Sequence, residues 1–210
     1  MSRRIDYYFS LVSPWAYIGQ RIFVDIARRH GAAVVYKPVL LTEVFAETGG
    51  LPLAKRHPAR QAYRMVELQR WREKRKLAFH LRPAHWPFDA DLANRAVLAL
   101  VATGADPAPF VLEVFDGVWE KQRNLGDPAA LAEALRETGF DPQGTLAKAD
   151  SDEIRAAYER NRVEAIAIGA FGSPCYVLDG EVFWGQDRLE LLDDALASGR
   201  PPFLADIGRQ

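Results

Sequence analysis

YFSLVSPWAY, residues 8–17, joins the end of one predicted element to the start of the next. Residues 5–10 (IDYYFS) are short, aromatic and β-prone, and they predict a strand. Ser13 is a favoured N-cap residue, and Pro14 occupies the first helical position, where its missing N–H costs no hydrogen bond. The stretch therefore predicts a helix directly after a strand. The Ser13 hydroxyl is expected at the helix N-terminus, where free N–H groups and the helix dipole favour an anion.

The segments that follow predict a β-α-β opening. Apolar side chains recur at helical spacing at Trp15, Ile18, Ile22 and Ile26. Gly31 supplies a helix stop, and residues 33–39 (AVVYKPV) predict a second strand. Because such crossovers are right-handed, the two strands are expected to be parallel neighbours.

The middle of the chain predicts helices only. From about residue 41 to residue 161 the patterns are helical, with helices expected at 60–77, 90–103, 107–121, 128–138 and 151–168. Residues 174–178 (PCYVL) and 181–184 (EVFW) then predict a hairpin around the Asp179-Gly180 turn, and residues 186–197 a last helix. The two ends are expected to form one domain, and the middle an inserted helical cap.

Composition narrows the function classes. The chain has 210 residues, which suits one domain with a large insertion, and its 27 basic and 28 acidic residues leave no excess positive charge for a nucleic acid. No apolar run approaches the ~20 residues of a membrane span, and the N-terminus lacks the pattern of a signal peptide. The single cysteine, Cys175, excludes an internal disulfide and fits a reducing compartment, so a cytoplasmic protein is expected. The four histidines show no metal-ligand spacing, and no metal site is predicted.

Two further stretches carry chemistry. In residues 171–180 (FGSPCYVLDG), Pro174 immediately precedes a strand that must pair, and a cis Ser173–Pro174 bond would explain its position. In residues 183–192 (FWGQDRLELL), Gln186 and Asp187 stand at a helix start, where they could cap the helix or hold an amino group.

On SPWAY (13–17) and residues 171–192, the chain resembles the 2-hydroxychromene-2-carboxylate isomerases, relatives of kappa-class glutathione transferases and DsbA-type thiol oxidoreductases. The resemblance covers essentially the whole chain. It implies an α/β, thioredoxin-like fold with a large α-helical insertion. The expected thioredoxin-like domain is residues 1–41 and 162–210, and the inserted helical domain is residues 42–161.

The resemblance also implies site residues. Ser13 stands where redox relatives carry a cysteine, and it would hydrogen-bond the glutathione sulfur as the catalytic residue. The implied glutathione-binding set is Ser13, Pro14, Trp15, Gly50, Ser173, Pro174, Gln186 and Asp187, and the implied substrate set is Arg60, Trp86 and Asp89. The backbone of Ser173 would pair with the cysteinyl unit, and the Gln186-Asp187 step would bind the γ-glutamyl end. Gly50 and Asp89 are departures, because these families often have asparagine there.

The implied activity is a glutathione-dependent cis-trans isomerisation of a small aromatic acid through a reversible thiolate adduct, in a cytoplasmic homodimer. Lowering a thiol pKa from about 8.5 to near neutrality needs roughly 2.7 kcal/mol. A helix dipole supplies about 0.3–1 kcal/mol, or ~2 when partly buried, so the Ser13 hydroxyl is needed as a second donor. A kappa-like transferase or peroxidase, and a non-catalytic adaptor or chaperone, stay open as alternatives. Cys175 is expected to be a buried, inert thiol.

Overall fold

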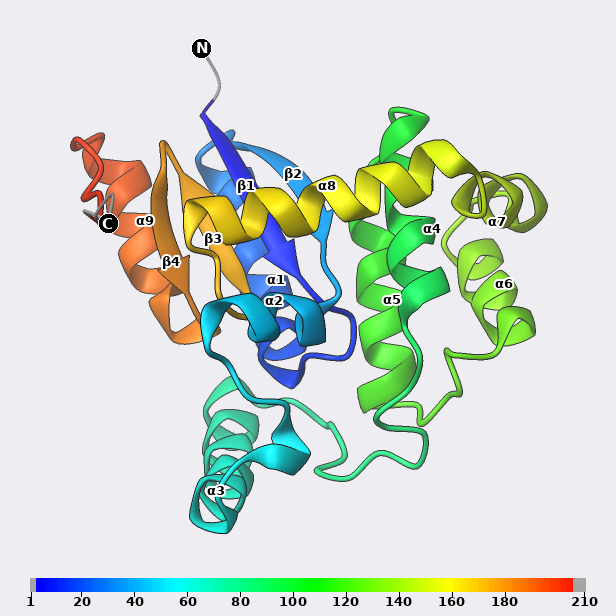
Figure 1. Ribbon diagram of the computed structural model, residues 1–210, viewed down its shortest axis with the longest axis horizontal. Helices are drawn as coiled ribbons and strands as arrows, with labels where there is room; N and C mark the ends of the chain where they lie inside the picture. The colour runs from blue at the N-terminus through cyan, green and yellow to red at the C-terminus, as the bar shows by residue number, and fades with distance from the viewer. Residues whose placement is uncertain (1–2, 206–210) are drawn as a thin grey trace.

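The computed structural model describes residues 3–205 and contains a four-stranded mixed sheet (Figure 1). The order is β2-β1-β3-β4, with bounds Arg4–Phe9 for β1, Ala33–Pro38 for β2, Cys175–Leu178 for β3 and Glu181–Trp184 for β4. β1 and β2 are parallel and are joined by α1 (Pro14–Arg29), whereas β3 is antiparallel to both β1 and β4. The predicted β-α-β opening and terminal hairpin are confirmed, and so is the thioredoxin-like fold.

The predicted helices of the middle segment all form. They are α3 (Pro58–Arg75), α4 (Asp91–Ala102), α5 (Ala108–Trp119), α6 (Pro128–Glu137) and α8 (Asp152–Ile168). Two helices of eight residues each, α2 (Leu41–Thr48) and α7 (Pro142–Ala149), were not predicted as separate elements, because two turns show too little periodicity. A short 3-10 turn, η1 (Leu53–Lys55), precedes α3. The last predicted helix begins as a second 3-10 turn, η2 (Gln186–Arg188), and continues as α9 (Leu189–Ser198).

The sheet is covered on both faces. Tyr7 and Tyr176 stack at 5.3 Å between ring centroids in a large core that includes the apolar face of α1. On the opposite face, Tyr8 packs with Val44 of α2 and Ala165 of α8 in a second cluster. In Figure 1, α8 (yellow) runs from the helical block across the sheet. The expected domain boundary between residues 161 and 162 falls inside this continuous helix, and residues 1–2 and 206–210 of the expected domain lie outside the described residues.

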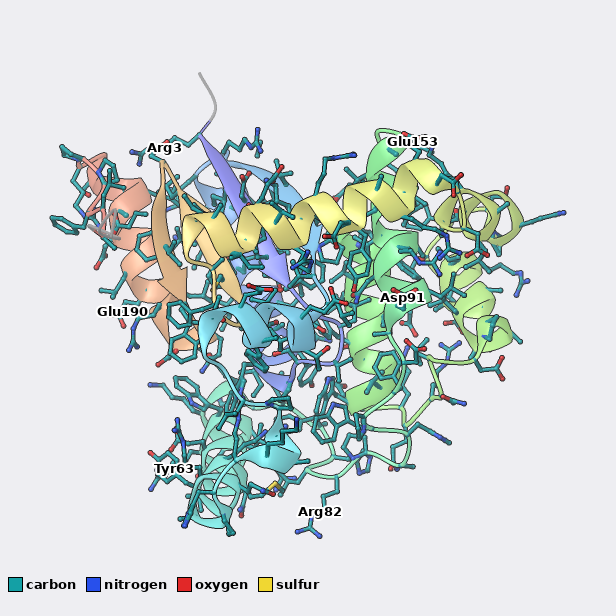
Figure 2. All side chains as sticks on the ribbon, viewed as in Figure 1. Arg3, Tyr63, Arg82, Asp91, Glu153 and Glu190 are labelled. Atoms are coloured by element: carbon teal, nitrogen blue, oxygen red, sulfur yellow. The ribbon has the colours of Figure 1, made fainter. Side chains whose placement is uncertain are left out.

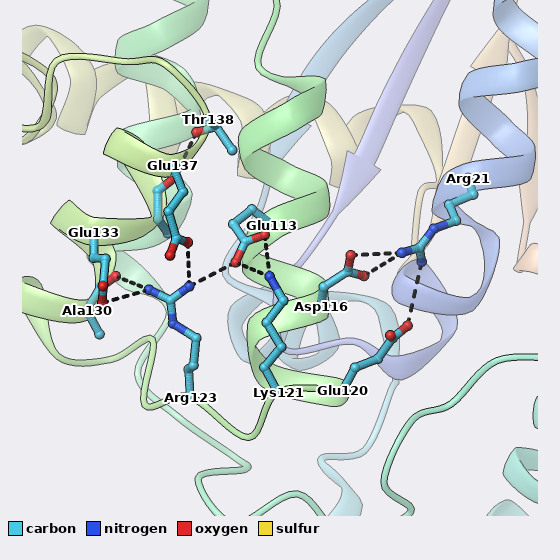
Figure 3. Close-up of polar contacts among 11 residues, drawn as sticks. Arg21, Glu113, Asp116, Glu120, Lys121, Arg123, Ala130, Glu133, Glu137 and Thr138 are labelled. Atoms are coloured by element: carbon cyan, nitrogen blue, oxygen red, sulfur yellow. Dashed lines mark hydrogen bonds and ion pairs between the residues drawn. The ribbon is translucent and has the colours of Figure 1, made fainter.

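Ion pairs tie the helical block to α1. Arg21 of α1 pairs with Asp116 of α5 at 2.8 Å, and its second contact is Glu120 at 3.8 Å (Figure 3). Arg123, which follows α5, contacts three glutamates on α5 and α6, namely Glu113, Glu133 and Glu137. The large core itself continues from β1 into α4, α5 and α6. The helical insertion therefore shares its core with the sheet.

Helix α3 lies at the edge of this body, and its Leu68 is buried in the large core. Figure 1 shows it below the sheet and away from α4–α7, and Figure 2 labels Tyr63 on this helix. Residues 76–90, which contain no helix or strand, lead from it to α4 and include a cis Trp86–Pro87 bond. No helix within residues 3–205 is both long and apolar enough to cross a membrane.

Candidate active site

Ser13 caps the N-terminus of α1. Its backbone is extended (φ −80°, ψ 119°), and its Oγ accepts a hydrogen bond from the Ala16 N–H at 3.2 Å. The same hydroxyl donates to the Ser173 carbonyl oxygen at 3.0 Å. Only 5% of Ser13 is exposed. The hydroxyl is thus fixed between a helix N-terminus and the segment that precedes β3.

That segment contains the predicted cis peptide bond between Ser173 and Pro174. Ser173 Oγ accepts from the Ser10 N–H at 2.9 Å, and the Pro174 carbonyl accepts from the Gly185 N–H at 2.9 Å. These bonds join the β1–α1 turn, the cis-proline segment and the end of β4. Within the described part of the chain, the Ser173 N–H has no hydrogen-bond partner. A polar group is therefore available to a ligand there.

A pocket of about 540 Å³ opens beside Ser173. Five of the residues implied from the sequence line it, namely Trp15, Arg60, Ser173, Gln186 and Asp187. They come from α1, α3, the cis-proline segment and η2. Ser13 is not a lining residue, but its Oγ lies 3.0 Å from the carbonyl oxygen of one.

The α3 wall of the pocket is basic, which sequence reasoning had foreseen at Arg60 alone. Arg56 and Arg64 also line the pocket, four residues to either side of Arg60. Arg60 and Arg64 lie four apart on α3 and so share one face, which was the available signal, whereas Arg56 precedes α3 at the end of η1. Three further lining residues that were not predicted are aromatic, namely Tyr63, Trp71 and Trp184, and the others are Ala59, Glu67, Gly185 and Arg188.

This wall carries uncompensated charge. Among residues 3–205, Arg56, Arg60 and Arg64 form no ion pair with a carboxylate: Arg56 donates to the Leu51 carbonyl, and Arg64 lies over the Trp86 ring. Burial and then the charge of Arg56 lower the pKa of Arg64 to about 10. Burial and the charge of Arg60 likewise lower the pKa of Arg56. An anion bound here would relieve the mutual repulsion.

The opposite wall offers an acid and an amide. Gln186 is 2% exposed, and its Oε1 accepts from Arg75 Nη2 at 3.3 Å, which ties η2 to the last turn of α3. The Asp187 side chain is 46% exposed and pairs with Arg188 at 2.7 Å. Gly185 has φ +100°, and a Cβ there would lie 2.4 Å from Asp187 Oδ1, so glycine is required at this position.

Six implied residues do not line this pocket. Ser13, Pro14 and Pro174 belong to the segments beside it, whereas Gly50, Trp86 and Asp89 lie elsewhere. Gly50 lies against Phe45, and a Cβ at position 50 would meet that ring at 2.3 Å, so the asparagine usual in the family would require Phe45 to move. Trp86 and Asp89 line a separate open hollow of about 480 Å³. Asp89 accepts a hydrogen bond from the Asp91 N–H at the start of α4.

Cys175 is fully buried next to Pro174, as predicted. Burial raises the pKa of its thiol to about 12. A thiol that stays protonated at neutral pH is a poor nucleophile. The redox chemistry of a surface cysteine is therefore not available at this site.

Comparison with known proteins finds relatives that match most of the chain. The model of the DSBA-like thioredoxin domain matches residues 4–197. A 2-hydroxychromene-2-carboxylate isomerase of Sphingobium xenophagum is 28% identical over 198 residues, which are 93% of this chain and 99% of the relative. Glutathione S-transferase kappa 1 of Caenorhabditis elegans is 24% identical over 210 residues, covering 94% of this chain and 92% of the relative.

A solved structure of a 2-hydroxychromene-2-carboxylate isomerase superposes with a TM-score of 0.80 at 25% identity, covering 93% of this chain and 95% of that one. The strand-helix junction at Ser13 and the cis-proline segment are both inside the matched range. The chain therefore belongs to the family of DSBA-like thioredoxin domains.

Proposed function

We propose that this protein is a glutathione-dependent isomerase that acts on a small aromatic acid of the 2-hydroxychromene-2-carboxylate type. The observation that carries the proposal is the Ser13 hydroxyl, held between the N-terminus of α1 and the Ser173 carbonyl at the edge of a basic, aromatic pocket. The relatives named as isomerases, which match over nearly their full lengths, support the reaction class. The kappa-class relative supports glutathione as the cofactor.

The pocket fits glutathione by charge and hydrogen bonding. Glutathione has an ammonium and a carboxylate at its γ-glutamyl end, a second carboxylate at its glycine end, and a peptide group on each side of the thiol. The partly exposed Asp187 carboxylate suits the ammonium, and the α3 arginines suit carboxylates. The free N–H and the carbonyl of Ser173 suit the cysteinyl backbone.

Ser13 would exchange one hydrogen bond for another when glutathione binds. Its hydroxyl now donates to the Ser173 carbonyl oxygen. If the cysteinyl N–H takes over that acceptor, the hydroxyl can turn toward the thiolate while its Oγ still accepts from Ala16. No buried group loses a partner in this exchange, so stabilising the thiolate leaves no polar atom unsatisfied.

Bound glutathione would supply a thiolate that adds reversibly to a conjugated carbon, so that a former double bond can rotate. The protein's own task is to orient the acid. Arg60 and Arg64 lie on the wall that faces η2 and can hold its carboxylate, and Trp15 and Trp184 offer ring faces to its aromatic part. A homodimer in the cytoplasm is proposed on the resemblance, and sedimentation of the purified protein tests the dimer.

The test combines binding and turnover. Calorimetric titration should give binding of glutathione, and 2-hydroxychromene-2-carboxylate should isomerise with the glutathione concentration unchanged at the end. S-methylglutathione is the matched control, because it can bind but cannot form a thiolate. Stoichiometric loss of glutathione would instead favour a kappa-like transferase. Failure to bind glutathione at millimolar concentration would overturn the enzyme assignment and favour a non-catalytic adaptor.

A further inference from the structure

Trp86 contacts the turn that carries Ser13 and does not line the main pocket. Its indole Nε1–H donates to the Val12 carbonyl oxygen at 2.8 Å. The N–H of the same peptide unit, that of Ser13, donates to the Ser10 carbonyl at 3.0 Å. The Val12–Ser13 peptide plane is therefore held at both of its polar ends.

Fixing this plane fixes the direction of the Ser13 side chain. The plane forms one side of the Ser13 φ angle, and a rotation about φ swings Cβ and Oγ around the backbone. The hydroxyl must reach both the Ala16 N–H at 3.2 Å and its acceptor on the other side. Because hydrogen bonds weaken steeply with misalignment, a loosened plane would weaken both contacts.

Trp86 is itself held in place on the side toward the pocket. The Arg64 guanidinium carbon lies 4.9 Å from its ring centroid, and the buried Trp119 packs against it at 5.7 Å. Arg64 belongs to the basic wall of the pocket. Trp86 thus connects that wall to the Ser13 turn, although it comes from residues 76–90, which form no helix or strand.

We propose that Trp86 is a positioning residue, whose indole N–H pins the Val12–Ser13 peptide and so aims the Ser13 hydroxyl. This role differs from the substrate contact that the family resemblance implies for Trp86. The consequence for catalysis rests on the proposed function, because the Ser13 hydroxyl matters there as the donor to a glutathione thiolate. The pin itself is a property of the protein alone.

The test is Trp86→Phe, which keeps an aromatic ring over Arg64 and Trp119 but removes the N–H donor. Amide hydrogen exchange of Ser13, followed by NMR, should become about fivefold faster, the equivalent of one net hydrogen bond. The amides of β1 should keep their rates, which checks that the variant is folded. Trp71→Phe is the matched control: it also removes an indole N–H, but from a residue of α3 whose ring lies under Lys74 and Arg75, so the Ser13 amide should be unaffected.

With glutathione bound, Trp86→Phe should raise the thiol pKa by about half a unit, because the Ser13 hydroxyl would be less well aligned with the thiolate and their hydrogen bond would weaken. The substrate KM should change little, and kcat at neutral pH should fall and recover as the pH rises. In a Ser13→Ala background the same substitution should not move the thiol pKa further.

Two results would overturn the proposal. One is unchanged Ser13 exchange, with or without a raised KM, which would make Trp86 a substrate contact or a purely structural residue. The other is faster exchange with an unchanged thiol pKa, which would separate the turn from the thiolate. If the wild type binds no glutathione, the proposed function fails, and the exchange rates alone still decide whether the pin exists.

Discussion

Replacing Ser13 with alanine separates a thiolate-stabilising hydroxyl from an ordinary helix cap. A hydrogen bond to a charged group contributes about 1.5–3 kcal/mol, and one pKa unit corresponds to about 1.4 kcal/mol. The thiol pKa of bound glutathione should therefore rise by about 1–2 units in Ser13→Ala. The helix dipole is unchanged by the substitution, so the pKa should stay below that of free glutathione.

The sign of the pH dependence follows from this shift. A higher thiol pKa means less thiolate at neutral pH, so activity should fall roughly 10- to 100-fold there and recover as the pH passes the new pKa. The cap to the Ala16 N–H is lost as well, which should cost about 0.5–2 kcal/mol of folding stability. Stability and thiol pKa must therefore be measured separately.

The assay is the ultraviolet absorbance of the thiolate of bound glutathione, titrated against pH. Ser173→Ala is the matched control. It removes a hydroxyl that accepts from the Ser10 N–H and leaves the Ser173 carbonyl and the Ser13 hydroxyl in place. It should lower the melting temperature without moving the thiol pKa. An unchanged pKa in Ser13→Ala, with activity lost equally at all pH values, would refute the assigned role of Ser13.

Three further predictions concern the surroundings of the site. Arg123→Met should destabilise the fold by about 1–2 kcal/mol, because a side chain that is 18% exposed loses three carboxylate partners. Denaturant unfolding measures the change, and an unchanged free energy of unfolding would mean that the network contributes nothing to stability. Gly185→Ala should weaken glutathione binding and lower the melting temperature, since Gly185 has φ +100° and the new Cβ would displace Asp187. Full glutathione affinity in a calorimetric titration of this variant would contradict the prediction. The thiol of Cys175, whose pKa burial raises to about 12, should resist alkylation at neutral pH in the native protein and react after unfolding, which mass spectrometry can follow.

Local chemistry explains why the core of the fold was predictable. The N-cap at Ser13, the proline at the first helical position and the Asp179-Gly180 turn are short-range signals, and each forms as predicted. The cis Ser173–Pro174 bond was predictable as well, because a proline before a pairing strand is a local conflict that one isomer resolves. The sheet order places β3 between β1 and β4, and this brings Ser173, before β3, close to Gln186 and Asp187, after β4.

The basic wall depended on tertiary structure. Arg60 and Arg64 follow helical spacing on α3, but spacing alone does not say whether a helix face meets solvent or a pocket, and Arg56 precedes the helix. The orientation of α3 is set by distant contacts such as that between Arg75 and Gln186, which are 111 residues apart. Gly50, Trp86 and Asp89, which the family resemblance implied as site residues, lie outside the pocket. Each stands in irregular backbone before or after α3, where no periodicity indicates the direction of a side chain.

A serine at the N-terminus of α1 changes what this thioredoxin-like framework can do. A helix N-terminus next to a cis-proline segment stabilises a thiolate wherever that sulfur comes from. In this chain the sulfur cannot be that of the single cysteine, Cys175, because it is buried with a raised pKa. The resemblance implies that Ser13 stands where redox relatives carry a cysteine. If the site acts on a thiolate, as proposed, a ligand such as glutathione must bring the sulfur. The groups that would hold such a ligand are the Ser173 N–H, the partly exposed Asp187 carboxylate, and Arg56, Arg60 and Arg64. Within residues 3–205 the Ser173 N–H has no hydrogen-bond partner and these arginines form no ion pair.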